Sequence, residues 1–390
     1  MKIGASAIVF IFLIPYTASL YNGLSRLFAM AFDIPYEACI IAMAVLTGVY
    51  VIAGGYMATA VNDFIQGIIM IGGIIAVIAS VLNLNGGFIG SLDALARVED
   101  ATASTTPGVF ASFFGPDPFN LLCVVILTSL GTWGLPLMVQ KFYAIKSEDA
   151  INKGTVISTA FAVIVAGGCY FLGGFGRLFN VDVKALGFDA VIPEMMSRLP
   201  DILLGIVIIL VLSASMSTLS SLVLASSSTL TIDLIKDNVV KNMDEKKQVL
   251  TMRVLIVVFI AISAILAIIQ YRNNVTFIAQ LMGVSWGALA GAFLAPFLYG
   301  LYWRKATKAS AWVCFIFGAG IMILNMLVRP MFPTALQSPI NCGAFAMIAG
   351  LIIVPVVSLF TKKVDKEKVE DAFSCYDKKV LVSAKEALGD

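Results

Sequence analysis

The sequence contains no histidine and few charged residues, which occupy 13% of its 390 positions against about a quarter in soluble domains. Because histidine is absent and the six cysteines form no CxxC pair, we expect no zinc site of the usual kind. No GxxxxGK loop is present, which argues against an ATP-driven pump within this chain. The net charge of +2 gives no indication of nucleic-acid binding.

Hydrophobic residues make up 59% of the chain, and the mean hydropathy is +0.95. They are gathered in about ten runs of roughly 18–25 residues, each long enough as a helix to cross about 30 Å of hydrocarbon. The runs are apolar on every face, unlike the alternating strands of a membrane barrel, so we expect an all-α polytopic membrane protein. The runs lie at 4–30, 37–54, 61–83, 118–140, 155–176, 202–232, 252–270, 275–301, 309–328 and 340–361.

The composition changes after Phe360, where the chain becomes charged and polar. We therefore expect a transmembrane domain over residues 1–361 and a charged cytoplasmic tail over residues 362–390. Most of the 26 Lys and Arg residues lie in this tail and in the loops on the same side as the amino terminus. The positive-inside rule then predicts that both ends of the chain are cytoplasmic.

A cluster of hydroxyl side chains lies within one predicted membrane helix, in the stretch SASMSTLSSLVLASSSTLT at 213–231. At 100° per residue, Ser213, Ser217 and Ser220 share a face, and Thr218 lies on its flank. Hard cations such as sodium prefer oxygen ligands, which neutral hydroxyls beside a backbone carbonyl can supply. The alternative is structural, because small residues let helices pack closely and Thr218 can bond back to the carbonyl of Ala214.

A second stretch, LGTWGLPLMVQKFYAIK at 130–146, places Gly131, Gly134 and Pro136 inside a run of membrane length. Proline removes a backbone donor and clashes with the preceding turn, so the helix is expected to bend or open there. Transporters build substrate sites from helices opened in this way, where the freed carbonyls line a cavity. An ordinary proline kink is the alternative.

A third stretch, GGYMATAVNDFIQG at 54–67, predicts a helix boundary. Gly54 and Gly55 are expected to end one helix, and Asn62 or Asp63 to cap the next. An acid at the end of a membrane helix is either such a cap or a functional group.

Two further patterns concern packing and connections. Gly283, Gly287 and Gly291 lie four residues apart, which predicts a close-packing surface for a neighbouring helix. The two long outer connections, at about 84–117 and 177–200, are expected either to carry short lid helices or to act as passive connectors.

Together these stretches resemble the sodium:solute symporter family, which includes proline and pantothenate permeases and sodium/glucose cotransporters. The matching pieces occur in family order: GGYMATAVNDFIQ, GLPLMVQKFYAIK, SASMSTLSSLVLASSSTLTIDL, and the run from Trp286 to Thr307. The resemblance implies a LeuT-like transporter core of inverted five-helix repeats with alternating access.

The same resemblance implies roles for individual residues. Ser217 and Thr218 correspond to a Ser-Thr pair that binds sodium together with the carbonyl equivalent to Ala214, and Asp63 corresponds to an acid on the sodium exit path. The helix matching 128–136 is broken and faces the substrate. Its residues here are Thr128, Thr132, Trp133, Gly134, Leu135 and Pro136, whereas relatives often have bulky polar or aromatic side chains in this segment.

The chain departs from the family pattern at its beginning, because its first apolar run resembles the fourth helix of the family. We therefore expect a truncated reading frame, a late-called start or a fragment that lacks about three helices and does not transport alone.

From these observations we expect sodium-coupled symport of an amino acid, a sugar or a small organic acid across the plasma membrane. The expected partners are the sodium ion, the solute and the lipid bilayer, with no other cofactor and no catalytic residues; no pattern assigns an oligomeric state. The alternatives are a proton-coupled carrier of the same fold and a transporter-like solute sensor. Protons are usually relayed by acids or histidines, of which the deep membrane segments have almost none.

Overall fold

The computed structural model of the protein describes residues 1–100, 103–142, 145, 147–240, 243–273 and 277–377. Within its helices, the side chains of residues 53–63, 140–142, 148, 237 and 377 lie outside the described part. In the described residues nearly all regular structure is helical, and the one β feature is an isolated bridge between Asp100 and Ser104. The predicted all-α class is confirmed.

The helices follow the apolar runs of the sequence, and several begin at a recognisable cap. Asp117 accepts a hydrogen bond from the Asn120 amide, Ser147 from the Ala150 amide, and Thr307 forms a capping box with Ser310. The α-helices are α1 (Lys2–Phe32), α2 (Tyr36–Asn83), α3 (Gly87–Ala96), α4 (Pro118–Gly131), α5 (Pro136–Phe142), α6 (Glu148–Phe161), α7 (Gly167–Gly174), α8 (Val183–Leu186), α9 (Val191–Ser197), α10 (Asp201–Thr229), α11 (Glu245–Asn273), α12 (Ile278–Tyr302), α13 (Lys308–Leu327), α14 (Pro339–Phe360) and α15 (Lys366–Phe373).

Short 3-10 and π segments extend or connect these helices. The π segments are η3 (Ala162–Ala166), which joins α6 to α7, and η6 (Leu230–Val239), which prolongs α10. The 3-10 segments are η1 (Val109–Ala111), η2 (Thr132–Gly134), η4 (Phe175–Phe179), η5 (Phe188–Ala190), η7 (Arg329–Met331), η8 (Thr334–Leu336) and η9 (Ser374–Asp377).

Among the described residues, eight stretches are long and apolar enough to span a membrane. The runs predicted at 37–54 and 61–83 belong instead to one helix, α2, so the expectation that Gly54 and Gly55 end a helix is wrong. Hydrocarbon offers no water to replace a broken backbone hydrogen bond, which lets a membrane helix continue through glycines that would end it in water. The run predicted at 118–140 is divided between α4 and α5.

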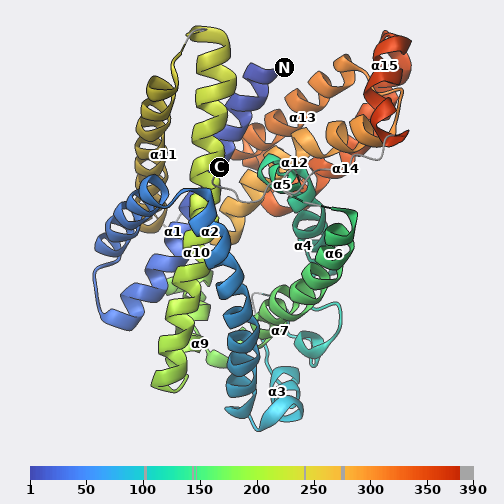
Figure 1. The fold of residues 1–390 in the computed structure, drawn as a ribbon. Coiled ribbons are helices and arrows are strands. Elements are labelled where there is room, and N and C mark those ends of the chain that lie inside the picture. Colours follow the sequence, from blue (N-terminus) through green and yellow to red (C-terminus); the bar gives the residue numbers. More distant parts are fainter. Residues whose placement is uncertain (101–102, 143–144, 146, 241–242, 274–276, 378–390) are drawn as a thin grey trace.

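The two long connections contain short helices. The first, at 84–117, includes α3 and η1, and the second, at 177–200, includes α8, η5 and α9. Both connections lie at the same end of the molecule, the lower end in Figure 1.

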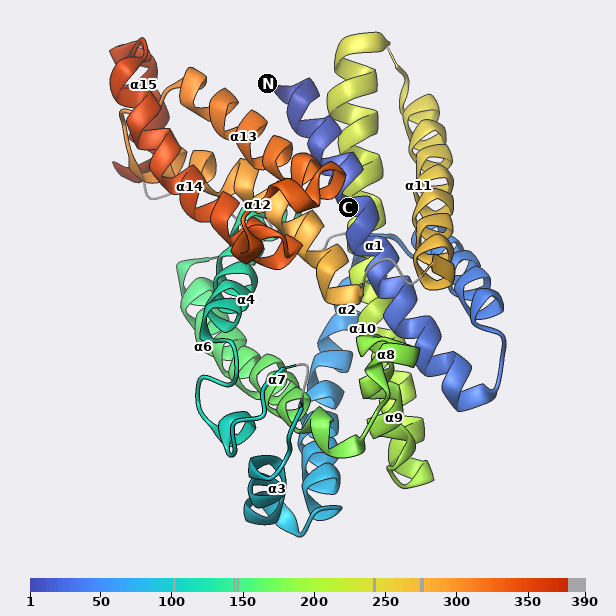
Figure 2. The same cartoon turned by 180° about the vertical axis from the view of Figure 1, so that it is seen from behind.

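Helix α12 is the most enclosed of the membrane-length helices. In its most apolar 18-residue window 67% of residues are buried, against at most 39% in the other seven. It contacts α1, α4, α13, α14 and η2. Figures 1 and 2 show α4, α6 and α7 on the opposite side of the molecule from α1 and α10. This group contacts α12 and α14 through α4, and it contacts α2 through α7 and η3.

The predicted glycine surface is confirmed, since it holds α12 against α13 and α14. A Cβ atom on Gly287 would lie 2.6 Å from the Cα of Gly343, and one on Gly291 would lie 3.0 Å from the Cβ of Ala346. From the opposite helix, a Cβ on Gly318 would lie only 2.3 Å from the carbonyl carbon of Gly291. Backbone atoms cannot move aside as a flexible side chain can, so these contacts require glycine.

This geometry predicts that Gly318→Ala separates α13 from α12 and destabilises the protein by about 1–3 kcal/mol, the usual cost of overpacking. Gly320→Ala is a matched control two residues away on the same helix, because a Cβ there meets nothing within 4 Å. Thermal melting of the detergent-solubilised protein is expected to show a lower midpoint for Gly318→Ala alone. Equal midpoints for the two variants would contradict the close approach of the helices.

Candidate functional site

The hydroxyl cluster lies in the middle of α10, on a flank that the rest of the described chain only partly covers. Met216, Leu219 and Val223 are buried in the main core and define the inward face of the helix. Ala214, Ser217 and Thr218 lie around the helix from that face and are half-buried. These residues therefore lie between the buried core face and the exposed surface of α10.

The oxygens of the cluster are oriented by bonds within the helix. The Thr218 hydroxyl donates to the carbonyl of Ala214 at 3.1 Å, and the Ser220 hydroxyl donates to the carbonyl of Ser217 at 2.8 Å. A hydroxyl that donates its proton retains two lone pairs, so Thr218 can still accept a cation. Two oxygens 3.1 Å apart can both lie about 2.4 Å from one ion, within the usual range of hard-cation distances. The same bond is what the structural alternative requires, so both interpretations fit this geometry.

The helix predicted to open at Pro136 is broken in the structure. Helix α4 ends at Gly131, η2 continues to Gly134, and Leu135 has an extended backbone with ψ 118° before α5 begins. Pro136 takes the first position of α5, where its missing amide costs nothing. The break at Leu135 therefore separates α4 and η2 from α5, and α5 contacts α10.

The break is seated on α12. A Cβ on Gly134 would lie 2.5 Å from the Cα of Ala290, and Leu135 is only 1% exposed. Extended backbone inside a membrane protein is tolerated where protein covers it, and α12 provides that cover.

The remaining predicted residues of the broken helix have different surroundings. The hydroxyls of Thr128 and Thr132 donate to the carbonyls of Val124 and Ser129, at 2.8 and 3.2 Å. Trp133 is 64% exposed, in contrast to the buried Leu135. Asp63 lies outside the described side chains.

An aromatic pair beside the break was not recognised from the sequence. The ring of Tyr16, on α1, meets the ring of Trp286, on α12, edge to face at 5.5 Å. A Cβ on Gly131 would lie 3.1 Å from Trp286, so the pair adjoins the end of α4. The Trp286 indole N–H is buried and has no hydrogen-bond partner among the described residues. In the sequence Trp286 contributed only to the family motif, and Tyr16 carried no signal.

A polar cluster lies where the later part of α1, the start of α2 and the end of α11 meet. Asn22 donates to the side-chain oxygen of Gln270 and accepts from the Tyr36 hydroxyl. Buried amides need such partners, so this network fixes the register of the three helices.

Next to it, Arg26 pairs with Asp189 at 3.8 Å. Its guanidinium lies 5.3 Å from the ring centroid of Tyr271, which stacks on Tyr36. Asp189 belongs to the second long connection and accepts a hydrogen bond from the Ile278 amide at the start of α12. The connection is thereby joined to α1 and α12.

Burial of the Asp189 carboxyl raises its pKa above the ordinary value of 3.8, while the Ile278 amide and the Arg26 guanidinium partly oppose the shift. The described residues contain no group of three or more His, Cys, Asp or Glu that could hold a metal ion.

A model of the sodium:solute symporter family matches residues 1–318. The chain belongs to this family. This chain is similar to the sodium/proline symporters of Staphylococcus aureus and of its strain JH9, with 29% and 28% identity over 382 residues. Each alignment covers 94% of the chain and 70% of the relative.

A solved structure has the same fold. It is a Na+-coupled sialic acid symporter in a substrate-bound outward-open state, and it matches with a TM-score of 0.65 and 16% identity. The match covers 93% of this chain and 75% of the sialic acid symporter's chain. The expected LeuT-like fold of this chain is thus confirmed, and the chain is a multi-pass membrane protein.

The raised pKa of Asp189 predicts a pH-dependent stability. A carboxyl with a raised pKa binds its proton more tightly in the folded state, so folded stability rises as the pH falls from the raised value toward 3.8. Asp189→Asn cannot titrate. As the pH falls below the raised pKa, the free energy of unfolding of the wild type should therefore increase relative to that of Asp189→Asn. The increase is about 1.4 kcal/mol for each unit by which the pKa is raised.

Melting midpoints of both proteins at pH 8, 6 and 4.5 measure this difference. Asp182→Asn, which removes an exposed carboxylate from the same connection, controls for the loss of one negative charge. A gap between the wild type and Asp189→Asn that is constant with pH would contradict the assigned environment of Asp189.

Proposed function

We propose that the protein couples inward sodium movement to the uptake of a small organic solute by alternating access. The observation that carries this proposal is the membership of the family, joined to a membrane helix with half-buried neutral oxygens at Ala214, Ser217 and Thr218. The solute is an amino acid, a sugar or a small organic acid, and amino acids are the first to test because similar proteins are named sodium/proline symporters.

Sodium is bound by the Ala214 carbonyl and the hydroxyls of Ser217 and Thr218, and Asp63 lies on its exit path. The solute binds beside the broken helix made by Thr128, Thr132, Trp133, Gly134, Leu135 and Pro136, in which the buried Leu135 and the closely packed Gly134 hold the break against α12. Trp286 supports this position of the solute site, because its unpartnered indole N–H adjoins the break and can donate to a polar solute.

The energetics of one sodium ion suffice for this work. A membrane potential of about 100 mV supplies ~2.3 kcal/mol per charge, and a tenfold sodium gradient adds ~1.4 kcal/mol. The sum of roughly 3.7 kcal/mol supports accumulation of about 500-fold. Sodium can drive the change only if it binds the outward-open state more tightly than the inward-open state. No covalent bond changes, so the protein needs no catalytic residue and no further cofactor.

The membrane is the plasma membrane, with both ends of the chain in the cytoplasm. Figure 1 supports this orientation for the amino terminus, which lies at the same end of the molecule as α15, beside the lysine-rich segment that follows α14.

The proposal is tested in proteoliposomes that carry an inward sodium gradient, with this chain and, because these residues are not expected to transport alone, also with the intact gene product that contains them. Uptake of labelled proline, other amino acids, sugars and organic acids is measured with sodium outside, and again with choline in its place at constant pH. We expect at least one solute to accumulate with sodium and not with choline. Uptake driven equally by a proton gradient would favour the proton-coupled alternative, and solute binding without uptake would favour a sensor.

Ser217→Ala and Thr218→Ala should each raise the sodium concentration for half-maximal uptake by about 5- to 100-fold, which corresponds to about 1–3 kcal/mol for one lost oxygen ligand. Ser228→Ala is the control, because Ser228 lies on the same half-buried flank of α10 and bonds only within the helix. Protein abundance in the membrane is measured in parallel. An unchanged sodium dependence in both variants would refute the site.

A further inference from the structure

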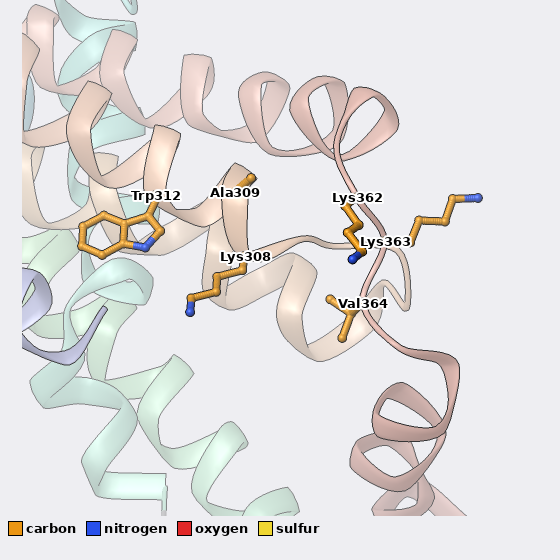
Figure 3. Close-up of a pocket in the computed structure, with 6 residues that line it drawn as sticks. All are labelled: Lys308, Ala309, Trp312, Lys362, Lys363 and Val364. Carbon is orange, nitrogen blue, oxygen red and sulfur yellow. The ribbon is translucent and has the colours of Figure 1, made fainter.

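A basic hollow lies where α13 begins and α14 ends. It has a volume of ≈ 460 Å³ and is lined by Lys308, Ala309, Trp312, Lys362, Lys363 and Val364. Figure 3 shows Lys308 and Trp312 on one side and Lys362, Lys363 and Val364 on the other. The two sides come from segments more than fifty residues apart in the sequence, and sodium coupling requires neither of them.

A buried hydroxyl network holds the two sides together. The Thr307 hydroxyl lies 2.7 Å from that of Thr361, and the Ser358 hydroxyl donates to that of Ser310 at 2.9 Å. Thr307, Ser310 and Ser358 are each at most 4% exposed. Because buried, fully paired networks are rigid, Lys308 and Lys362 have fixed backbone positions on opposite sides of the hollow.

The segment that carries Lys362 and Lys363 is also fixed at its far end. There α15 and η9 are joined to α12 and the residues that follow it. The Arg304 guanidinium lies 5.2 Å from the ring centroid of Phe373, and the Tyr376 hydroxyl donates to the carbonyl of Leu301 at 2.8 Å. The hollow is therefore bounded by backbone that is held at both ends.

The charge of the hollow is uncompensated within the described chain. None of its three lysines has a carboxylate within ion-pair distance among the described residues. The nearest acid in the sequence is Asp365, which precedes α15 and whose side chain makes no capping bond to that helix. A group of cations without a protein counter-ion attracts an anion with several oxygens, such as a phosphate.

The surroundings of the hollow are those of a membrane interface. Leu359 and Phe360, at the end of α14, are 69% and 86% exposed, and Ile316, one turn from Trp312, is 68% exposed. Tryptophan is enriched at the depth of lipid headgroups, and apolar side chains beyond it face acyl chains. A soluble phosphate would leave these apolar side chains uncovered, whereas a phospholipid covers them and the lysines together.

We propose that this hollow binds the headgroup of an anionic phospholipid, which the positive charges of Lys308, Lys362 and Lys363 at its rim attract, with the acyl chains along α13 and α14. Basic pockets between membrane helices bind such headgroups through the same combination of charge and apolar surface. The site is separate from the hydroxyl cluster on α10, so it extends the proposed function rather than resting on it.

The test is native mass spectrometry of the full chain with equal amounts of phosphatidylglycerol and phosphatidylcholine, which differ in headgroup charge. The wild type is expected to retain phosphatidylglycerol preferentially. Lys308→Gln, Lys362→Gln and Lys363→Gln should each weaken this binding by about fivefold. Replacing the same lysines by arginine keeps the charge and should preserve binding.

The control variant combines Lys246→Gln, Lys247→Gln and Arg253→Gln, which remove three positive charges from α11 on the same side of the molecule. Its retention of phosphatidylglycerol is expected to stay within about twofold of the wild type. An equal loss in the control, or equal retention of the two lipids by the wild type, would overturn the proposal. Displacement of phosphatidylglycerol by inorganic phosphate at the same concentration would also overturn it, because the hollow would then be a site for soluble phosphate.

A melting curve of each variant without lipid shows whether it is folded. Lys308→Gln is the decisive variant if another lysine variant or the triple control is unfolded. Lys308 is exposed, and its substitution leaves the hydroxyl network intact. Unchanged lipid preference in that single variant would then count against the site.

Discussion

The structure depends on one constraint: inside hydrocarbon, each backbone amide and carbonyl must find its partner within the protein. This constraint makes nearly every described element a helix, and it allows a helix to open only where protein covers the opening. The opening at Leu135 satisfies it. Gly134 comes so close to Ala290 that α12 shields the extended backbone from lipid.

Helix α12 connects this opening to the rest of the fold. On one side, Gly287 and Gly291 bring it into backbone contact with α13 and α14. On the other side, Trp286 meets Tyr16 of α1 beside the end of α4. A displacement of α12 would therefore reach the three-helix packing, the break and the aromatic pair at once. Alternating access requires such rigid coupling between elements, because packed interfaces move as units.

The same constraint determines how an ion can be held. A fixed charge in the bilayer is costly, whereas hydroxyl and carbonyl oxygens already engaged in a helix can accept a small cation with little rearrangement. The bond between Thr218 and Ala214 illustrates this point, since it holds a hydroxyl oxygen and a carbonyl oxygen 3.1 Å apart within the helix. Charge is placed instead at the ends of the molecule, where Arg26 pairs with Asp189 at one end and Lys308 and Lys362 border the hollow at the other.

The sequence by itself determined that the chain is helical, that the helix before Pro136 bends or opens, and that the Gly287 surface packs closely; the structure decided for an opening at Leu135. These properties are local. The length of an apolar run, the missing amide of a proline and the small size of a glycine each affect only the few helical turns around them. Only the structure decided that α2 continues past Gly54 and Gly55, since the lack of water inside hydrocarbon overrides local helix-ending signals. It alone also joined Asn22 to Gln270, Arg26 to Asp189 and Tyr16 to Trp286. Each of these pairs spans well over a hundred residues of sequence, and no periodicity within one segment specifies which distant side chain will satisfy a buried polar group.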